Sequence, residues 1–357
     1  MTGAPVVVVT GIAEAPMAAA TIALQWDLPS AVVVQHSIDV GEQRLHRVVS
    51  DVTGTLDHTV IELQHACVTC AIREDVVPTL RQVSGDGRWD AVIAHLPVGA
   101  EASQLCRVSA HEGRAGAPIA GVIATLNGET LIDDLLGDDL LCERGLHSSD
   151  EDERGVGEVG AAMIEYADHI ALSGKAVAKG KALVAALARP GISVLPDCSD
   201  LDAGTVLNQR RRHSSSESWV AEVRRAPIRT TPQQDVWTLD LRSSRPLHPD
   251  RLLEALECIG GGPRRSRGCF WLPSRPSEIC GWQGAGGRLS VGSVGSWGLS
   301  KRLTRITVTG LDDGADNIRR AFEQCLLTPA EVNATGARWN VAEDGFEHWL
   351  GPITRVA

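Results

Sequence analysis

The N-terminal region of the chain alternates short apolar runs with segments of helical character. The first run is Val6–Val9, four consecutive valines that lead into Thr10 and Gly11. Runs of this kind, rich in β-branched residues, are typical of strands buried on both faces. Because helical segments lie between most of the runs, the pattern predicts an α/β domain with a mostly parallel sheet covered by helices. The predicted strands are residues 5–10, 31–34, 59–63, 91–94, 118–125, 169–172 and 191–195.

The pattern changes in the second half of the chain. A polar stretch that contains Arg210–Arg212 is typical of a linker. Strand and helix patterns then resume and predict a smaller α+β domain. The predicted organisation is a first domain over residues 1–198, a linker over 199–232, a second domain over 233–331 and a tail over 332–357.

The charge and the hydrophobic pattern exclude several classes of partner. The chain has 34 basic and 45 acidic residues, a formal net charge of −11, so direct DNA binding is not expected. No apolar run approaches the ~20 residues that span a bilayer, and the N-terminus lacks the pattern of a secretory signal. We therefore expect a cytoplasmic protein without membrane contact, whose nine cysteines are reduced thiols.

Separate segments of the chain carry a family resemblance. They are residues 9–18 (VTGIAEAPMA), 62–75 (ELQHACVTCAIRED), 164–168 (IEYAD), and 245–252 (RPLHPDRL) with 268–272 (GCFWL). Together they resemble the CobW family of P-loop GTPases, which are linked to metal insertion and zinc homeostasis. The resemblance implies a P-loop NTPase-like first domain and a CobW-type second domain.

The segment that falls at the family's phosphate-binding loop has lost its ligands. A phosphate loop needs glycines for close backbone approach, Lys for the phosphate oxygens, and Ser or Thr for Mg²⁺. Gly11 is retained, but Glu14 and Pro16 stand at the later glycine positions. Met17 replaces the Lys and Ala18 replaces the hydroxyl residue. We therefore expect a pseudo-GTPase, not an enzyme, with no bound nucleotide and with small apolar residues filling the phosphate space.

Two further nucleotide elements also differ from the pattern that the resemblance implies. The strand at residues 91–94 is followed by His95–Gly99, which offers no carboxylate to support a metal. The stretch expected to recognise guanine reads Ser173–Ala176 and lacks the Asp that accepts from the base. No catalytic or cofactor-binding residue is therefore predicted.

The thiol pair Cys67 and Cys70 is the retained chemical feature. Two thiols at C-x-x-C spacing can chelate one soft metal ion. The family resemblance implies metal ligands here, with Thr69 in place of a middle cysteine. The predicted helix start near Arg73 should lower the pKa of Cys70. His65 could add a third ligand, although a lone histidine is more often structural.

Alternative interpretations of the thiol pair remain open. A single C-x-x-C supplies half of a tetrahedral zinc site, so zinc binding would be weak or regulatory. The pair could instead be a redox dithiol or an inherited relic. The remaining cysteines have no close pairing and are expected to be small core residues.

The combination of a degenerate phosphate loop, a C-x-x-C and a CobW-type domain narrows the resemblance. It most closely resembles actinobacterial members that help bring a ribosome hibernation factor to the small ribosomal subunit under zinc limitation. The resemblance implies a non-catalytic, zinc-responsive recruitment factor that acts through protein–protein interaction. The alternative from another class is a GTP-dependent zinc metallochaperone of the CobW type.

Overall fold

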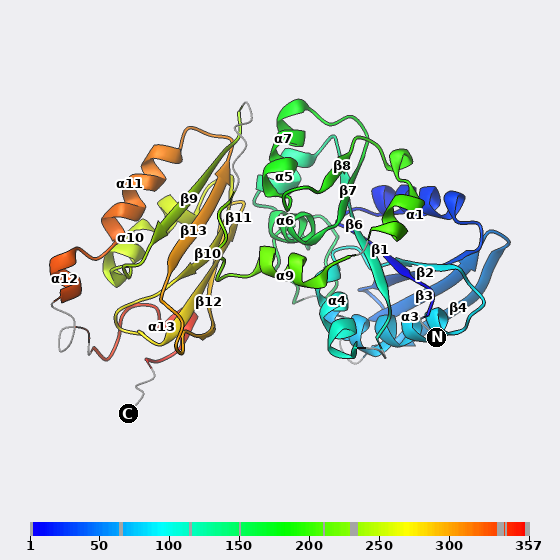
Figure 1. Ribbon diagram of the computed structural model, residues 1–357, viewed down its shortest axis with the longest axis horizontal. Helices are drawn as coiled ribbons and strands as arrows, with labels where there is room; N and C mark the ends of the chain where they lie inside the picture. Colours follow the sequence, from blue (N-terminus) through cyan, green and yellow to red (C-terminus); the bar gives the residue numbers. More distant parts are fainter. Residues whose placement is uncertain are drawn as a thin grey trace. The chain divides into compact units, whose positions relative to one another are not determined.

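The computed structural model describes residues 3–63, 67–113, 116–149, 151–209, 211–228, 235–333, 339 and 341–353 (Figure 1). The chain forms two compact units. The first comprises residues 1–134 with 139–219, and the second comprises 135–138 with 220–357. The boundary falls inside the stretch expected to be a linker, residues 199–232. The start of that stretch is folded, because Ala203 and Val206 are buried in the core of the first unit.

The first unit is built on an eight-stranded sheet with the order β4-β3-β2-β5-β1-β6-β7-β8. Along the stretch β2-β5-β1-β6-β7-β8 of this order, neighbouring strands are parallel. Strand β3 pairs antiparallel with both of its neighbours, β2 and β4. All residues of β1 are buried, as the valine run predicted. The strands are β1 (Val6–Gly11), β2 (Ala31–Asp39), β3 (Arg44–Asp51), β4 (Gly54–Glu62), β5 (Ala91–His95), β6 (Ile119–Asn127), β7 (His169–Ser173) and β8 (Ser193–Leu195).

Helices cover both faces of this sheet, and Figure 1 shows α1 on one side with α3 and α4 on the other. Helix α1 buries Met17, Ala20 and Leu24 against the valines of β1. The helices are α1 (Glu14–Asp27), α2 (Val68–Ala71), the π-helix η1 (Ile72–Val76), α3 (Val77–Gly85), α4 (Ala102–His111), α5 (Leu131–Leu136), α6 (Val156–Tyr166), α7 (Ala178–Leu187), the 3₁₀-helix η3 (Cys198–Asp200), α8 (Ala203–Asn208) and α9 (His213–Val220).

The second unit is an antiparallel five-stranded sheet with the order β12-β11-β10-β13-β9. Two amphipathic helices, α10 and α11, pack on it. In α11 the buried residues Ile318, Phe322 and Cys325 recur at helical spacing. The elements are β9 (Trp237–Ser243), α10 (Pro249–Gly260), β10 (Arg264–Phe270), β11 (Glu278–Ala285), β12 (Arg288–Ser296), β13 (Thr304–Gly310), α11 (Ala315–Cys325), α12 (Pro329–Asn333) and α13 (Glu347–Leu350).

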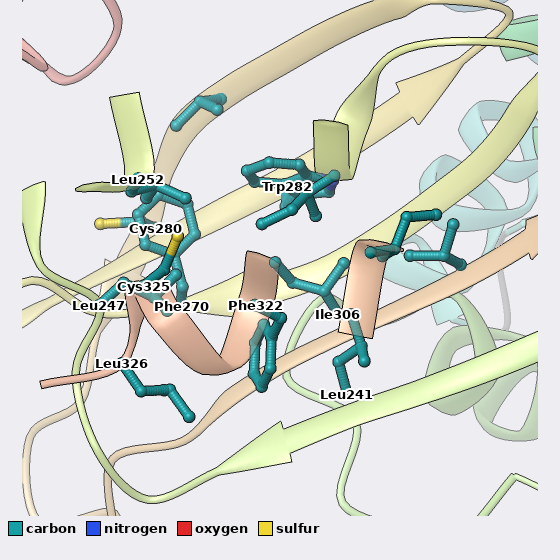
Figure 2. Packing of buried hydrophobic residues seen from close by; sticks show 14 of the residues in the cluster. Leu241, Leu247, Leu252, Phe270, Cys280, Trp282, Ile306, Phe322, Cys325 and Leu326 are labelled. Carbon is teal, nitrogen blue, oxygen red and sulfur yellow. The ribbon is translucent and has the colours of Figure 1, made fainter. Parts of the chain in front are cut away.

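The core of the second unit lies between its sheet and these helices (Figure 2). Trp282 and Phe270 are fully buried and meet edge to face, with ring centroids 6.1 Å apart. The indole nitrogen of Trp282 donates to Oγ of Ser266 at 2.9 Å, so the buried donor is satisfied.

The expected fold class is confirmed: a mostly parallel α/β sheet covered by helices, followed by a smaller α+β unit. Strand β3 of the first unit escaped the sequence analysis, which predicted no strand over residues 44–51. None of the described helices has the length and apolar character that a membrane span requires.

Candidate functional site

The segment expected to form a phosphate loop is a tight strand–helix junction. Strand β1 ends at Gly11, and helix α1 already begins at Glu14, so only Ile12 and Ala13 connect them. Pro16 lies in the first turn of the helix, where it has no N–H to offer. The residues that would have to curve around phosphates are helical instead.

Met17, the residue at the lysine position, points into the core. Its side chain is fully buried and belongs to the same cluster as Val7 and Val9. A Cβ atom at Gly11 would lie 2.9 Å from Cγ of Met17 and 2.6 Å from Oγ1 of Thr125. The interior next to Gly11 is therefore filled by atoms of Met17 and Thr125, whereas Ala15, one of the small residues expected to fill such a space, is exposed.

A small cluster of polar side chains lies at the carboxyl end of β5, where the sequence analysis found a histidine and no carboxylate. His95 is buried, and its Nδ1 lies 2.9 Å from Oγ1 of Thr21 on α1. Its Nε2 lies 3.6 Å from Glu14, which also accepts from the amide of Gln35 at 3.2 Å. Burial lowers the pKa of His95 despite the opposing charge of Glu14. The ring is neutral near pH 7, and the group links α1 to β2 and β5.

The stretch Ser173–Ala176 leaves β7 through a turn that requires glycine. Gly174 has a φ of +79°, in the left-handed region that glycine favours. Ser173 is half-buried, and Lys175 is exposed.

The thiol pair lies at the N-terminal end of the helical segment that follows β4. Cys67 is the N-cap of α2, and its Sγ accepts a hydrogen bond from the backbone N–H of Cys70 at 3.3 Å. Both thiols are free and half-buried. The side chain of Thr69 between them donates to Gln104 of α4 at 3.2 Å. The C-x-x-C therefore holds both sulfurs at one turn, with access from solvent.

The expectation that the helix N-terminus lowers the pKa of Cys70 is wrong. The hydrogen bond with Cys67 raises the pKa of Cys70, and burial and the Cys67 charge act in the same direction. The neighbouring sulfur outweighs the helix end because it interacts directly with the thiol, whereas α2 is only four residues long. Without a metal, this hydrogen bond favours the protonated form of Cys70.

Asp75 anchors the segment that carries the thiols. Its carboxylate lies 2.8 Å from Nε2 of His36 on β2 and 2.7 Å from the guanidinium of Arg47 on β3. Thr79 also donates to it at 3.3 Å. Burial raises the pKa of Asp75, but these partners outweigh burial, and the net pKa is lowered. The ionised carboxylate ties η1 to the first two strands of the β2–β4 hairpins.

The structure brings Cys67 and Cys70 together at one helical turn. Among the described residues, no three His, Cys, Asp or Glu side chains are grouped so as to hold a metal ion. His65, the candidate third ligand, lies outside the described residues. Two soft ligands suit zinc chemically, and the remaining coordination positions would need water or another molecule.

Most of the remaining cysteines behave as expected for core residues. Cys106, Cys198, Cys269, Cys280 and Cys325 are buried. Burial raises the pKa of Cys106 and Cys198 to about 11, so these thiols are inert. Cys142 and Cys258 are exposed, contrary to that expectation.

Sequence reasoning missed the partners that position the site. His36 gave no signal because it lies on β2 beyond the predicted end at residue 34, and Arg47 gave none because it lies on the unpredicted β3. Asp75 was visible in the Arg73–Asp75 motif, but its ion-pair role was not. The signal in the sequence that could have revealed this ion-pair role is a charged residue on the inward face of a helix.

The fold and site together define a protein with a mostly parallel α/β unit that carries a free thiol pair, followed by a second unit with an antiparallel sheet. Residues 236–326 match the family described as the cobalamin synthesis protein cobW C-terminal domain. This match lies within the second unit.

Similar proteins carry names that refer to zinc. The chain is 26% identical to the zinc chaperone Rv0106 of Mycobacterium tuberculosis, over 89% of this chain and 87% of the relative. It is 22% identical to the zinc-regulated GTPase metalloprotein activator 1 of Dictyostelium discoideum, over 82% and 70% of the two chains. A crystal structure of the Zn(II)-bound YjiA GTPase from E. coli aligns with a TM-score of 0.37 and 16% identity, covering 92% of this chain and all of that one.

Proposed function

We propose that the chain is a zinc-responsive binding protein, related to zinc chaperones, that works without nucleotide hydrolysis. The observation that carries the proposal is the start of α1 at Glu14, with Met17 buried against Gly11. A domain whose phosphate loop is replaced by helix keeps its fold but has no place for the charge stabilisation that phosphoryl transfer needs. Such a fold is free to act as a binding scaffold.

The zinc response is assigned to Cys67 and Cys70. Both sulfurs are accessible and lie at one helix turn, and the relatives named above are a zinc chaperone and a zinc-regulated GTPase. Two ligands alone bind zinc weakly, and binding must displace the thiol protons. Occupancy would therefore change with zinc supply, as a responsive element requires.

The partner in this proposal follows from the sequence resemblance. It is a ribosome hibernation factor, which the protein would help bring to the small ribosomal subunit. The formal charge of −11 favours contacts with basic proteins over contacts with bare RNA.

The test is a pull-down of purified hibernation factor and small subunits with the wild type and with Cys67→Ser/Cys70→Ser, at defined free zinc. Serine keeps the size but supplies no thiolate, so zinc-dependent recovery should be lost in the double variant. Cys142→Ser/Cys258→Ser is the matched control, because these thiols are also accessible. Undiminished, zinc-dependent recovery by the folded double variant would exclude the thiol pair.

A GTP-dependent zinc metallochaperone is the second candidate, and the names of the relatives favour it. The two candidates differ in nucleotide binding. Calorimetric titration of the wild type with GTP and Mg²⁺ separates them: micromolar affinity supports the metallochaperone, and no heat of binding supports the nucleotide-free protein.

A further inference from the structure

The outer face of helix α1 is apolar although it is exposed. Helix α1 already buries Met17, Ala20 and Leu24 on its inner face. On the other side, Ile22 is 65% exposed and Trp26 is 86% exposed. A helix that is apolar all round normally has both sides covered. The exposed side of α1 therefore has the composition of a contact surface.

A groove runs along this outer face within the first unit. Ala19, Ile22, Ala23 and Trp26 line it from α1, at the i, i+3, i+4, i+7 spacing of one helical stripe, and Cys198 and Leu201 line the opposite side. Its volume is about 400 Å³, and its lining is mainly apolar. Small Ala side chains leave the space, and Trp26 stands at its edge. This is the shape that receives one large apolar side chain.

The segments that form the groove are acidic. Residues 12–28 and 191–208 contain five carboxylates and no Lys or Arg, and two of the five, Asp27 and Asp197, line the groove itself. Hydrogen bonds from Ser199 lower the pKa of Asp197, and those from Thr205 and Gly204 lower the pKa of Asp202. Both stay ionised at neutral pH. The nearest cation in sequence is the exposed Lys175, two residues after Ser173 of the lining.

We propose that this groove, here called the Trp26 groove, is a docking site for a positively charged segment of a partner protein that inserts an apolar side chain beside Trp26. Carboxylates around an apolar recess favour Lys and Arg flanking an apolar anchor. The same charges repel anionic lipid surfaces and nucleic acid, so they favour a polypeptide as the occupant.

This inference goes beyond the proposed function because it involves neither zinc nor the thiols. Cys67 follows β4 at one edge of the sheet, whereas the groove lies near β7 and η3 toward the other edge. Failure of one proposal therefore leaves the other intact. A Trp26 variant should keep its zinc response, and a thiol-free variant should keep its groove.

The probe is a displayed library of random 16-residue peptides, selected on the wild-type protein and counter-selected on Trp26→Ala. Trp26 is 86% exposed, so its replacement should leave the fold intact, as circular dichroism will check. We expect enriched peptides that combine a large apolar residue with Lys or Arg. Synthetic copies should bind Trp26→Ala at least tenfold more weakly than wild type in fluorescence anisotropy.

Two further variants sharpen the test. Leu299→Ala, an exposed apolar residue of the second unit, should bind the peptides like wild type. Asp197→Asn/Asp200→Asn should weaken binding and reduce its salt dependence. Equal affinity of wild type and Trp26→Ala, or enrichment of peptides without basic residues, would overturn the proposal. A Trp26-dependent dimer in light scattering would also overturn it, because the occupant would then be a second copy.

Discussion

The carboxylate of Asp75 lies 2.8 Å from Nε2 of His36, and this contact joins the helical segment that follows the thiol pair to strand β2. Asp75 also pairs with Arg47 of β3 at 2.7 Å. Both side chains of the His36–Asp75 pair are largely buried. If one partner is removed, water cannot readily solvate the other, so its loss costs free energy of folding. The position of the thiols relative to the sheet depends on this carboxylate.

Asp75→Asn should destabilise the first unit by about 2 kcal/mol, because it leaves His36 and Arg47 with a neutral partner. Asp57→Asn is the matched control: Asp57 also faces Arg47, at 3.7 Å, but is more than half exposed. Its loss should cost less than about 0.5 kcal/mol. Urea unfolding at pH 7 measures both values, and equal effects would contradict the anchoring role.

The same pair predicts a pH dependence. The folded-state pKa of Asp75 is lowered, so its stabilising contribution is present above the unfolded pKa of about 3.9. The contribution is lost as the pH falls through the lower folded value. The stability difference between wild type and Asp75→Asn should therefore shrink below about pH 4. A difference that stays constant from pH 7 to pH 3 would show that it does not arise from the ionised carboxylate.

Introducing Lys at position 17 and Thr at position 18 should not create a nucleotide site. Met17→Lys buries a charge in a fully apolar position and should destabilise the protein by more than about 3 kcal/mol. Ala18→Thr, at a half-buried position, should cost only about 0.5 kcal/mol through helix propensity. Thermal unfolding measures the difference. Micromolar GTP binding by the double variant in calorimetry would show that the loop can open, contrary to this prediction.

His95 predicts a loss of stability in mild acid. Burial lowers its folded-state pKa below the unfolded value of about 6.5, so the unfolded chain takes up the proton first. Stability is complete above pH 6.5 and declines below it. His95→Asn keeps a polar group near Thr21 but does not titrate, so its unfolding free energy should fall less between pH 7.5 and 5. Glu14→Gln should steepen the decline, because Glu14 raises the pKa of His95. Parallel pH profiles would contradict both expectations.

Strand runs and helix spacing were sufficient to predict much of the fold. The valines of β1 and the helical spacing of α11 report directly which side chains are buried, and burial determines the element. Strand β3 was missed because its residues 44–51 mix charged and apolar side chains. Its exposed neighbour β4 supplies pairing through the backbone, which has no sequence signature.

The candidate site was only partly predictable for a related reason. Met17 and Ala18 are visible in the sequence, but the start of α1 at Glu14, shortly after β1 ends at Gly11, is a backbone property. The pKa of Cys70 was predicted with the wrong sign, because a helix end is visible in a pattern and a thiol–thiol hydrogen bond is not. The Trp26 groove gave no sequence signal, since its two sides are far apart in the chain.

The last prediction concerns the coupling of the two thiols. In the wild type, the hydrogen bond with Cys67 raises the pKa of Cys70, so alkylation of Cys70 should have a midpoint above the value of about 8.5 for a free cysteine. Cys67→Ala removes that bond and the neighbouring charge. The pKa of Cys70 should then fall, and its alkylation at pH 7.5 should become several-fold faster. Peptide mapping by mass spectrometry distinguishes Cys70 from the other thiols.

Cys67→Ser is the matched control for this change. A serine at the N-cap still accepts from the backbone N–H of Cys70 and can still bond to its thiol, so Cys70 should react more slowly than in Cys67→Ala. Because zinc must displace the proton of Cys70, whose pKa is raised, wild-type zinc affinity should rise with pH near neutrality. Slower alkylation of Cys70 in Cys67→Ala, or zinc affinity independent of pH, would show that the two sulfurs do not act as a coupled pair.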